Sequence, residues 1–333
     1  MALFKSNNNL KPEDNTGFGA SSNNSGGRFY DRKNDRANVI KRGVDILDRY
    51  SWYHTLLGIS RGKFLIFIFI GYVFVNLIFA GIYYLIGIGH LSGVHTGSIW
   101  KNFSEVFFFS AQTFTTVGYG RISPTGFITS TVATFEAFIG LLSFAIATGL
   151  FYGRFSRPRA FLKFSDNALI APYKAGKAFM LRMAPYKNNN LSEAEVKLTM
   201  GMQVEEDGRM ANKFYPLKVE ISNINSLVLS WTIVHAIDEK SPLYGFSKED
   251  IKNAKLEVLV FVKAFDEVFS NTVVERTSYI SEEIIWGAKF RLMYHPSHDN
   301  TKTILDMARL NEFDRVEFPE PIRVSPEINQ LNL

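Results

Sequence analysis

The first half of the chain contains two long apolar stretches separated by a shorter one. Residues 64–89 contain no charged side chain, and residues 126–153 contain only Glu136. A helix rises about 1.5 Å per residue, so about 20 apolar residues cross the hydrocarbon core of a bilayer. Both long stretches reach this length and predict membrane-spanning helices. Residues 102–116 are apolar but too short to span, which favours a re-entrant helix.

The second half of the chain follows a different pattern, with short apolar runs between turn residues. The runs are rich in β-branched and aromatic residues, which favour strands, and they lie at 168–173, 178–183, 227–237, 256–262 and 271–280. Turn signals occur at 174–177 and 205–209. Ser247 and Asp250 have the spacing of a capping box, which predicts a short helix at 248–254. Many short strands over this length predict an all-β, immunoglobulin-like sandwich.

The re-entrant segment ends in the octet Thr-Phe-Thr-Thr-Val-Gly-Tyr-Gly at residues 113–120. In a potassium filter, the backbone carbonyls of such a loop replace the hydration shell of the ion. Gly118 and Gly120 permit the dihedrals that direct successive carbonyls toward one axis. We therefore predict an ion-binding filter formed by Thr116, Val117, Gly118, Tyr119 and Gly120.

The predicted ligands of K+ are the Thr116 hydroxyl and the carbonyls of Thr116, Val117, Gly118 and Tyr119. One such loop encloses no axis by itself, so the octet also predicts a homotetramer. The alternative, a buried Gly/Tyr turn, does not explain why the octet lies between two apolar spans.

These patterns divide the chain into five segments. We predict a disordered N-terminal tail at 1–38, an interfacial helix region at 39–60, a transmembrane pore domain at 61–157, a cytoplasmic β-sandwich domain at 158–325 and a C-terminal tail at 326–333. The tail is rich in Asn, Ser and Gly and buries too little apolar surface to offset its ordering entropy. The expected fold class is a membrane α-helical two-span pore domain with a re-entrant pore helix, followed by a cytoplasmic all-β immunoglobulin-like sandwich.

Basic residues indicate the orientation of the two spans. They cluster before the first span and after the second, whereas residues 90–125 carry only Lys101 and Arg121. By the positive-inside rule, both termini are expected in the cytoplasm. Apolar residues at helical spacing in 46–58 predict an amphipathic helix on the inner membrane surface. An ordinary juxtamembrane helix without a mechanical role is the alternative.

One face of the second span is predicted to line a pore. At about 100° per residue, Leu141, Thr148 and Tyr152 lie within about 40° of one another, and Phe144 flanks them. Tyr152 is the last bulky residue before a basic cluster, so four copies could close the inner mouth as a hydrophobic gate. The alternative is a tyrosine of the interfacial aromatic belt.

Glu136 lies about 140° from this stripe and is not expected to line the pore. An intramembrane carboxylate is costly unless it is paired or hydrogen-bonded. We expect Glu136 to support the filter from behind, together with Gln112 and the threonine hydroxyls of the pore helix. A direct ion site at Glu136 is the less favoured alternative.

Composition excludes several function classes. The chain has 333 residues, is 46% apolar, carries a net charge of +5 and contains no Cys, which excludes a disulfide-stapled ectodomain. It shows no glycine-rich nucleotide fingerprint and no cysteine nucleophile, and the pair His295 and His298 lacks the spacing and carboxylate partners of a metal site. We predict no enzyme, no organic cofactor and no nucleic-acid partner; K+ is expected only as the permeant ion.

The chain resembles the inward rectifier potassium channels, in particular their bacterial branch, over about residues 45–320. The residues that carry the resemblance are 116–120, 149–160, 164–170, 232–244, 278–279 and 283–287. The resemblance implies a tetramer with an outer helix, pore helix, filter and inner helix, and a β-sandwich that continues the conduction path. It also implies a bacterial inner membrane, and residues 46–58 look like the family's slide helix, which couples the cytoplasmic domain to the gate.

Roles for the basic residues that follow the second span are also implied. Arg154, Arg157, Arg159 and Lys163 look like the family's cluster that meets anionic lipid headgroups. Basic residues near the inner leaflet gain about 1 kcal/mol each from anionic lipid. The alternative is that these four residues only set the topology.

Two positions depart from the family pattern. Strong rectifiers carry an acidic residue where this chain has Phe144, so strong polyamine block is not expected. Arg121 follows the filter where many potassium channels carry Asp, so four copies would place positive charge at the outer mouth.

The sequence therefore predicts a homotetrameric potassium-selective channel of inward rectifier type, with passive conduction through the filter. Opening would be controlled at the inner helix bundle and modulated by anionic lipid. The alternative from another class is a non-conducting membrane receptor whose β-sandwich is a binding module.

Overall fold

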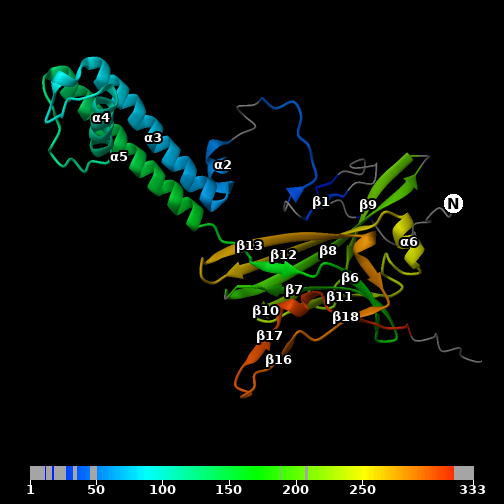
Figure 1. The fold of residues 1–333 in the computed structure, drawn as a ribbon. Helices are drawn as coiled ribbons and strands as arrows, with labels where there is room; N and C mark the ends of the chain where they lie inside the picture. Colours follow the sequence, from blue (N-terminus) through cyan, green and yellow to red (C-terminus); the bar gives the residue numbers. More distant parts are fainter. Residues whose placement is uncertain are drawn as a thin grey trace, which may run out of the picture. The chain divides into compact units, whose positions relative to one another are not determined.

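The computed structural model describes residues 12, 17–18, 28–32, 36–45, 51–187, 189–206 and 209–318. The chain separates into two compact units, one at residues 41–157 and one that combines residues 1–40 with 158–333. The first is built from helices and the second is mostly β-structure (Figure 1). We call them the helical unit and the β unit.

Two long helices dominate the helical unit. α3 (Arg61–Ile86) and α5 (Phe127–Phe155) have 26 and 29 residues and are apolar enough to cross a membrane. Only 17% and 11% of their apolar windows are buried inside the structure, whereas the core helix of a water-soluble protein would be mostly buried. The two predicted spans are therefore confirmed, with boundaries shifted by a few residues.

α4 (Ile99–Phe114) follows α3 and has 16 residues, too few to span a bilayer. It begins after Ser98, whose hydroxyl accepts a hydrogen bond from the N–H of Lys101. A shorter helix, α2 (Trp52–Gly58), precedes α3 and forms the second part of the predicted interfacial helix. Residues 46–50, its first part, lie outside the described residues.

The helical unit has a small apolar core where its three larger helices meet. Tyr83 of α3 packs its ring edge-on against Phe109 of α4, with 5.1 Å between the ring centroids. Ala133 of α5 completes this cluster. The loops that flank α4 are joined by a short antiparallel pair, β3 (Leu91–Ser92) and β4 (Ser123–Pro124). Many other large side chains of α3 and α5 are exposed, which a lipid environment accommodates.

The β unit is a sandwich of two five-stranded sheets (Figure 1). The first sheet contains β8 (Leu191–Glu206), β9 (Arg209–Leu217), β10 (Asn223–Ser226), β12 (Glu257–Asp266) and β13 (Asn271–Ile280). The second contains β5 (Leu162–Phe164), β6 (Ala168–Tyr173), β7 (Gly176–Pro185), β11 (Trp231–Ile237) and β14 (Ile284–Trp286). Neighbouring strands are antiparallel, apart from β14, which runs parallel to β6.

The core of the β unit lies between these two sheets. Every second residue of β12 is buried, including Val258, Val260 and Val262, as expected of a strand with one face toward a core. They belong to one apolar cluster with Leu181 and Ile233 of the opposite sheet. The predicted all-β sandwich is therefore confirmed.

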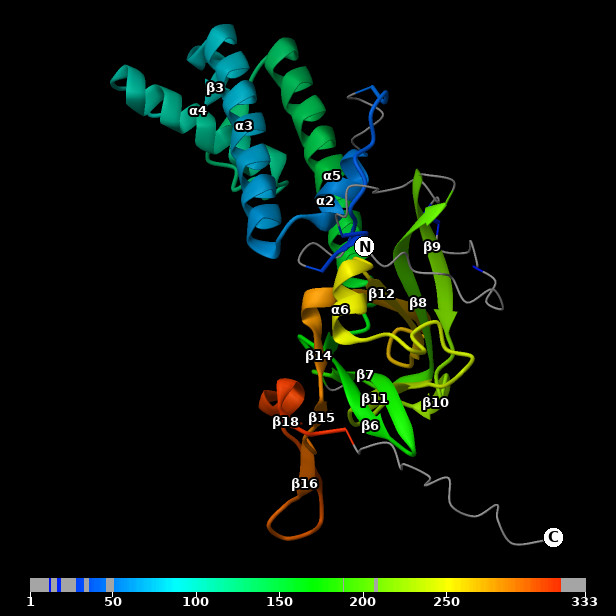
Figure 2. The same ribbon diagram turned by 90° about the vertical axis from the view of Figure 1, so that its right-hand side faces the viewer.

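Shorter elements surround the sandwich. β8 and β9 extend beyond the rest of their sheet, since β8 pairs with β12 only as far as Gly201 but with β9 as far as Glu206 (Figures 1 and 2). Two small antiparallel pairs follow β14, namely β15 (Ala288–Phe290) with β18 (Phe313–Arg315) and β16 (Tyr294–Pro296) with β17 (Thr303–Leu305).

Most sequence predictions for this unit agree with the structure. The helix predicted at 248–254 is α6 (Lys248–Asn253), and Ser247 and Asp250 form the expected reciprocal capping box. The strand predicted at 227–237 begins only at Trp231. The long strands β8 and β9 were not predicted.

The predicted disorder of residues 1–38 is wrong for the last part of that range. β1 (Tyr30–Asp31) and β2 (Arg36–Ala37) form an antiparallel pair that belongs to the β unit. Phe29 and Tyr30 are 6% and 7% exposed, so this part does bury apolar surface, which the Asn-, Ser- and Gly-rich composition of the tail as a whole did not indicate. The predicted C-terminal tail at 326–333 lies outside the described residues.

Candidate functional site

The chain turns back on itself at the end of α4. The N–H of Thr116 donates to the carbonyl of Thr113 at 3.0 Å. The N–H groups of Val117 and Gly118 both donate to the carbonyl of Gln112, at 3.0 and 3.3 Å. These main-chain bonds fix the loop at 116–120 directly to the last turn of α4.

The backbone of this loop alternates between two conformations. φ is positive at Thr116 (58°), Gly118 (51°) and Gly120 (81°), and it is negative at the intervening Val117 and Tyr119. Alternation of left- and right-handed residues turns successive carbonyl groups toward the same side of the chain, which is the arrangement that a carbonyl-lined ion site requires. The side chains of Val117 and Tyr119 are 53% and 79% exposed.

Thr116 contributes strain that sequence reasoning missed. The glycines accept a positive φ without steric cost, but Thr116 is β-branched and pays about 1–2 kcal/mol for the left-handed conformation. The hydrogen bonds of Val117 and Gly118 to α4 oppose this strain. Thr116 could be assigned to the loop because it lies directly before Val-Gly-Tyr-Gly. A threonine, however, gives no reason to expect a positive φ.

Glu136 on α5 is fully buried and binds to two other helices. Its Oε2 accepts a hydrogen bond from the hydroxyl of Tyr83 on α3 at 2.7 Å. Its Oε1 accepts one from the hydroxyl of Ser110 on α4 at 2.5 Å. The Ser110 hydroxyl also lies 3.1 Å from the side-chain oxygen of Asn76. One carboxylate therefore links α3, α4 and α5 behind the loop.

Gln112 and the threonines of α4, which were expected to support the loop together with Glu136, form bonds of their own. The hydroxyls of Thr113 and Thr115 donate to carbonyls within α4, those of Phe109 and Ala111. Gln112 contributes its main-chain carbonyl to the loop instead of a side-chain bond to Glu136. The side chains that face the Glu136 carboxylate are therefore those of Ser110 and Tyr83, and Gln112 contacts the loop through its main chain.

Gly140 allows α5 to approach the end of α4. A Cβ atom at this position would lie 2.0 Å from the carbonyl oxygen of Phe114, which is main chain and has no freedom to move aside. α5 continues through Gly140 from Phe127 to Phe155. Gly140 thus allows close packing against Phe114, the last residue of α4.

Arg121 does not extend freely into solvent. Its guanidinium forms an ion pair with Glu105 of α4 at 2.5 Å and lies 3.5 Å from the carbonyl of Gly93. Arg121 is 46% exposed and Glu105 15% exposed. The expected positive charge at the outer mouth is therefore partly neutralised within each chain, and Glu105 is a contributor that sequence reasoning missed.

The predicted pore stripe lies on an exposed face of α5. Leu141, Phe144 and Tyr152 are 59%, 74% and 75% exposed in the single chain, and Thr148 is exposed as well. The Thr148 hydroxyl donates to the carbonyl of Phe144, so its polar group is satisfied within the helix. This face is therefore available to line a pore or to meet other copies of the chain.

Arg154 differs from its predicted role as a lipid-facing residue. Its guanidinium donates hydrogen bonds to the carbonyls of Leu56, at 3.0 Å, and Ile59, at the end of α2. It also lies over the ring of Phe64, 4.9 Å from the centroid. Arg154 thus caps the carbonyl end of α2 and attaches it to α5.

The other three basic residues remain accessible. Arg157, Arg159 and Lys163 are exposed. The Lys163 ammonium lies 5.5 Å from the ring centroid of Tyr186. Within the described residues there is no group of three or more His, Cys, Asp or Glu side chains that could hold a metal ion.

Comparison with known proteins matches both units. Residues 162–329 match the family model described as "Inward rectifier potassium channel C-terminal domain", and residues 71–157 match the one described as "Ion channel". The chain is 33% identical over 281 residues to inward rectifier potassium channel Kirbac3.1 of Paramagnetospirillum magnetotacticum, covering 83% of this chain and 92% of the relative.

Two animal proteins are also similar. The chain is 28% identical over 346 residues to G protein-activated inward rectifier potassium channel 2 of Pongo abelii, covering 90% of this chain and 79% of the relative. It is 26% identical over 297 residues to inward rectifier potassium channel irk-1 of Caenorhabditis elegans, covering 82% of this chain and 54% of the relative.

Removing a hydroxyl that faces Glu136 should destabilise the helical unit. Tyr83→Phe leaves one carboxylate oxygen without its donor, and we expect the free energy of unfolding to fall by about 1–3 kcal/mol. Titration with a denaturing detergent measures this change. Tyr84→Phe is the matched control, because the Tyr84 hydroxyl makes no hydrogen bond within the described residues. The double variant Tyr83→Phe with Glu136→Gln should lose less free energy of unfolding than the sum of the two single variants. Equal losses of this free energy in Tyr83→Phe and Tyr84→Phe would contradict the interpretation.

Proposed function

The chain belongs to the inward rectifier potassium channel family, and we propose that it is a homotetrameric channel that conducts K+ selectively and passively. The observation that carries this proposal is the alternating φ along Thr116–Gly120, at the end of a helix too short to span. Four such loops around one axis would form successive rings of carbonyl oxygens. The homologues are ion channels and not enzymes.

K+ would be bound without its hydration shell. The proposed ligands are the hydroxyl of Thr116 and the carbonyls of Thr116, Val117, Gly118 and Tyr119. Their positions depend on the bonds to the Gln112 carbonyl and on the depth of α4, which Glu136 sets through Ser110. In this proposal Glu136 supports the filter and does not bind the ion.

We place the gate at Tyr152, near the end of α5. Four exposed tyrosines that converge on the axis would leave a narrow apolar constriction, which excludes water and therefore ions. Leu141, Phe144 and Thr148 would line the cavity between this gate and the filter. Phe144 carries no charge that could hold a polycation, so strong rectification by block at this position is not expected.

Anionic lipid is the proposed modulator of the gate. Arg157 and Arg159 are exposed directly after α5 and are free to meet headgroups, and Lys163 follows at the start of the β unit. Each such residue gains about 1 kcal/mol near an anionic leaflet. Arg154 would act differently, by transmitting movement of the slide helix α2 to α5.

The location follows from the distribution of basic residues on either side of the spans. Both termini, and the β unit with them, would lie in the cytoplasm. We propose a bacterial inner membrane as the location, and the similarity to the channel of Paramagnetospirillum magnetotacticum supports this placement.

Gly118→Ala should abolish potassium selectivity. A Cβ meets nothing within 4 Å at this position of the single chain, but φ of +51° is strained for alanine, so the carbonyls of the loop are expected to turn. The measurement compares K+ and Na+ flux into liposomes containing the purified protein. Gly89→Ala is the control, because its φ is not positive and its surroundings are open. Unchanged selectivity in Gly118→Ala would remove the filter assignment.

Tyr152→Ala should raise resting K+ flux. The constriction widens and fills with water, so the closed state loses its barrier. Single-channel recording in bilayers would show an open probability several-fold higher. Ile146→Ala removes an exposed apolar side chain from another face of α5 and should leave open probability near the wild-type value. An unaltered open probability in Tyr152→Ala would move the gate elsewhere.

The basic residues should separate into two classes. Replacing Arg157 and Arg159 with Gln is expected to reduce the flux response to anionic lipid without lowering thermal stability, because both side chains are exposed. Arg154→Gln should instead lower thermal stability, since two carbonyls of the α2 end lose their donor. Lipid titration of flux and thermal unfolding in detergent provide the two measurements. If the flux response to anionic lipid is unchanged in the double variant, the proposed lipid contact is contradicted, and Arg157 and Arg159 serve only to set the topology.

A further inference from the structure

A cavity of about 360 Å³ opens on the surface of the β unit between α6 and β14, which lie close to each other in Figure 2. The short 3-10 turn η2 (Ser281–Glu283) precedes β14 and contributes to the same wall. The Ser281 hydroxyl donates to the carbonyls of Ile251, at 2.9 Å, and Leu256, at 3.2 Å, so η2 is bonded to the end of α6. No residue proposed for the filter, the gate or the lipid contact lines this cavity.

One part of the cavity lining is apolar. Ile251 and Ile284 are 3% and 8% exposed, and the partly exposed side chains of Ile285 and Trp286 continue this surface. Sites for small organic molecules typically have volumes of about 300–1,000 Å³ and combine an apolar surface with a few polar groups. The size and the apolar lining of this cavity therefore suit a small molecule with an apolar body.

The rest of the lining is mainly cationic. Lys248, Lys252 and Arg315 are exposed, and in the part of the chain that the structure describes none of them forms an ion pair with a carboxylate. Arg315 donates from a terminal nitrogen to the carbonyl of Trp286 at 3.1 Å, which holds its guanidinium beside the apolar surface. The Lys177 ammonium lies 5.0 Å from the ring centroid of Trp286 and adds a further positive charge.

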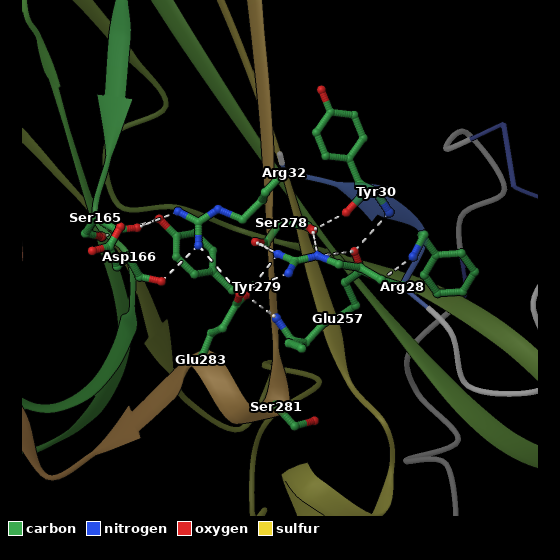
Figure 3. A network of polar contacts seen from close by, with 12 residues as sticks. Arg28, Tyr30, Arg32, Ser165, Asp166, Glu257, Ser278, Tyr279, Ser281 and Glu283 are labelled. Atoms are coloured by element: carbon green, nitrogen blue, oxygen red, sulfur yellow. Dashed lines mark hydrogen bonds and ion pairs between the residues drawn. The ribbon is translucent and has the colours of Figure 1, made fainter. Parts of the chain in front are cut away.

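The two acidic residues of η2 have different surroundings. Glu282 lines the cavity and is exposed. The carboxylate of Glu283 is bound elsewhere, because both terminal nitrogens of Arg28 donate to it at 2.9 Å and a terminal nitrogen of Arg32 lies 3.8 Å away (Figure 3). One carboxylate thus opposes three cations in the cavity lining, which leaves an excess of positive charge.

We propose that this cavity binds a small organic anion, with its charged groups near Lys248, Lys252 and Arg315 and its apolar body against Ile285 and Trp286. A carboxylate, phosphate or sulfonate group would form charge-assisted hydrogen bonds with these cations. The apolar body would remove the apolar lining from water. An inorganic anion offers only the first contribution, and an uncharged aromatic molecule offers only the second.

Naphthalene-1,5-disulfonate is the probe for this site, because it combines a flat apolar body with two fixed negative charges. Saturation-transfer difference NMR measures its binding to the full-length protein in phosphatidylcholine nanodiscs, with empty nanodiscs as the baseline. At low salt a Kd of about 0.1–1 mM is expected for a ligand of this size. Raising the salt concentration to about 0.5 M should weaken binding several-fold, because exposed charges are screened.

Charge variants of the lining should change this Kd in opposite directions. Lys248→Gln combined with Lys252→Gln should raise the Kd about fivefold or more, because two of the three cations are lost. Glu282→Gln should lower the Kd about twofold, because it removes the opposing carboxylate. Lys302→Gln, in the turn between β16 and β17, removes an exposed lysine outside the cavity and is the matched control. All four side chains are exposed, so the fold should persist, and thermal unfolding checks this.

The apolar contribution is tested separately. Inorganic pyrophosphate carries charge without an apolar body, so it should displace the probe only at concentrations about tenfold or more above the Kd of the probe. Ile285→Ala should raise the Kd of the probe about threefold, because apolar contact area is lost, and it should leave the competition by pyrophosphate unchanged.

Three results would overturn the proposal. They are the absence of probe binding, wild-type affinity in the double lysine variant, and pyrophosphate that binds as tightly as the probe. If the double lysine variant keeps wild-type probe binding but loses the flux response to anionic lipid, Lys248 and Lys252 contact lipid headgroups instead. Because the NMR measurement needs no ion flux, its outcome is independent of the proposed conduction.

Discussion

A single buried carboxylate joins the helices of the helical unit. Glu136 accepts from Tyr83 on α3 and from Ser110 on α4, and it is itself part of α5. Inside a bilayer no water could replace either donor, so separation of the helices would leave a polar group unsatisfied in hydrocarbon. α4 is therefore fixed in depth and rotation, and the strained loop that follows it keeps its position because the Gln112 carbonyl that anchors it does not move.

Features with a local or periodic cause could be predicted from the sequence. The two spans follow from uninterrupted apolar length, and α6 from the Ser247–Asp250 capping box, whose two hydrogen bonds close over three residues. The loop at 116–120 was recognisable because Gly118 and Gly120 stand where φ is positive. In each case the physical requirement acts on residues that are neighbours in the sequence.

Features that depend on distant partners could not be predicted. The partners of Glu136 on α4 could not be named from the sequence, because the packing angle of α4 decides which of its side chains faces α5, and that side chain is Ser110. Residues 28–32 were predicted to be disordered because the N-terminal stretch to which they belong is rich in Asn, Ser and Gly. Their order comes from Glu257, Ser278 and Glu283, more than 200 residues away in the chain. Arg154 was likewise predicted to contact lipid, but its guanidinium donates to two carbonyls at the end of α2.

The bonds of Arg154 have a mechanical consequence. They attach the end of α2 to α5 only two residues after Tyr152, and Gly153 between them packs against Tyr53 of α2, leaving little space for sliding. α2 and the last turn of α5 are therefore expected to move together as one rigid body. In the proposed channel, a rotation of α2 would reach the proposed gate at Tyr152 as torque, with little loss to bending, so the work of opening would be set by what turns α2.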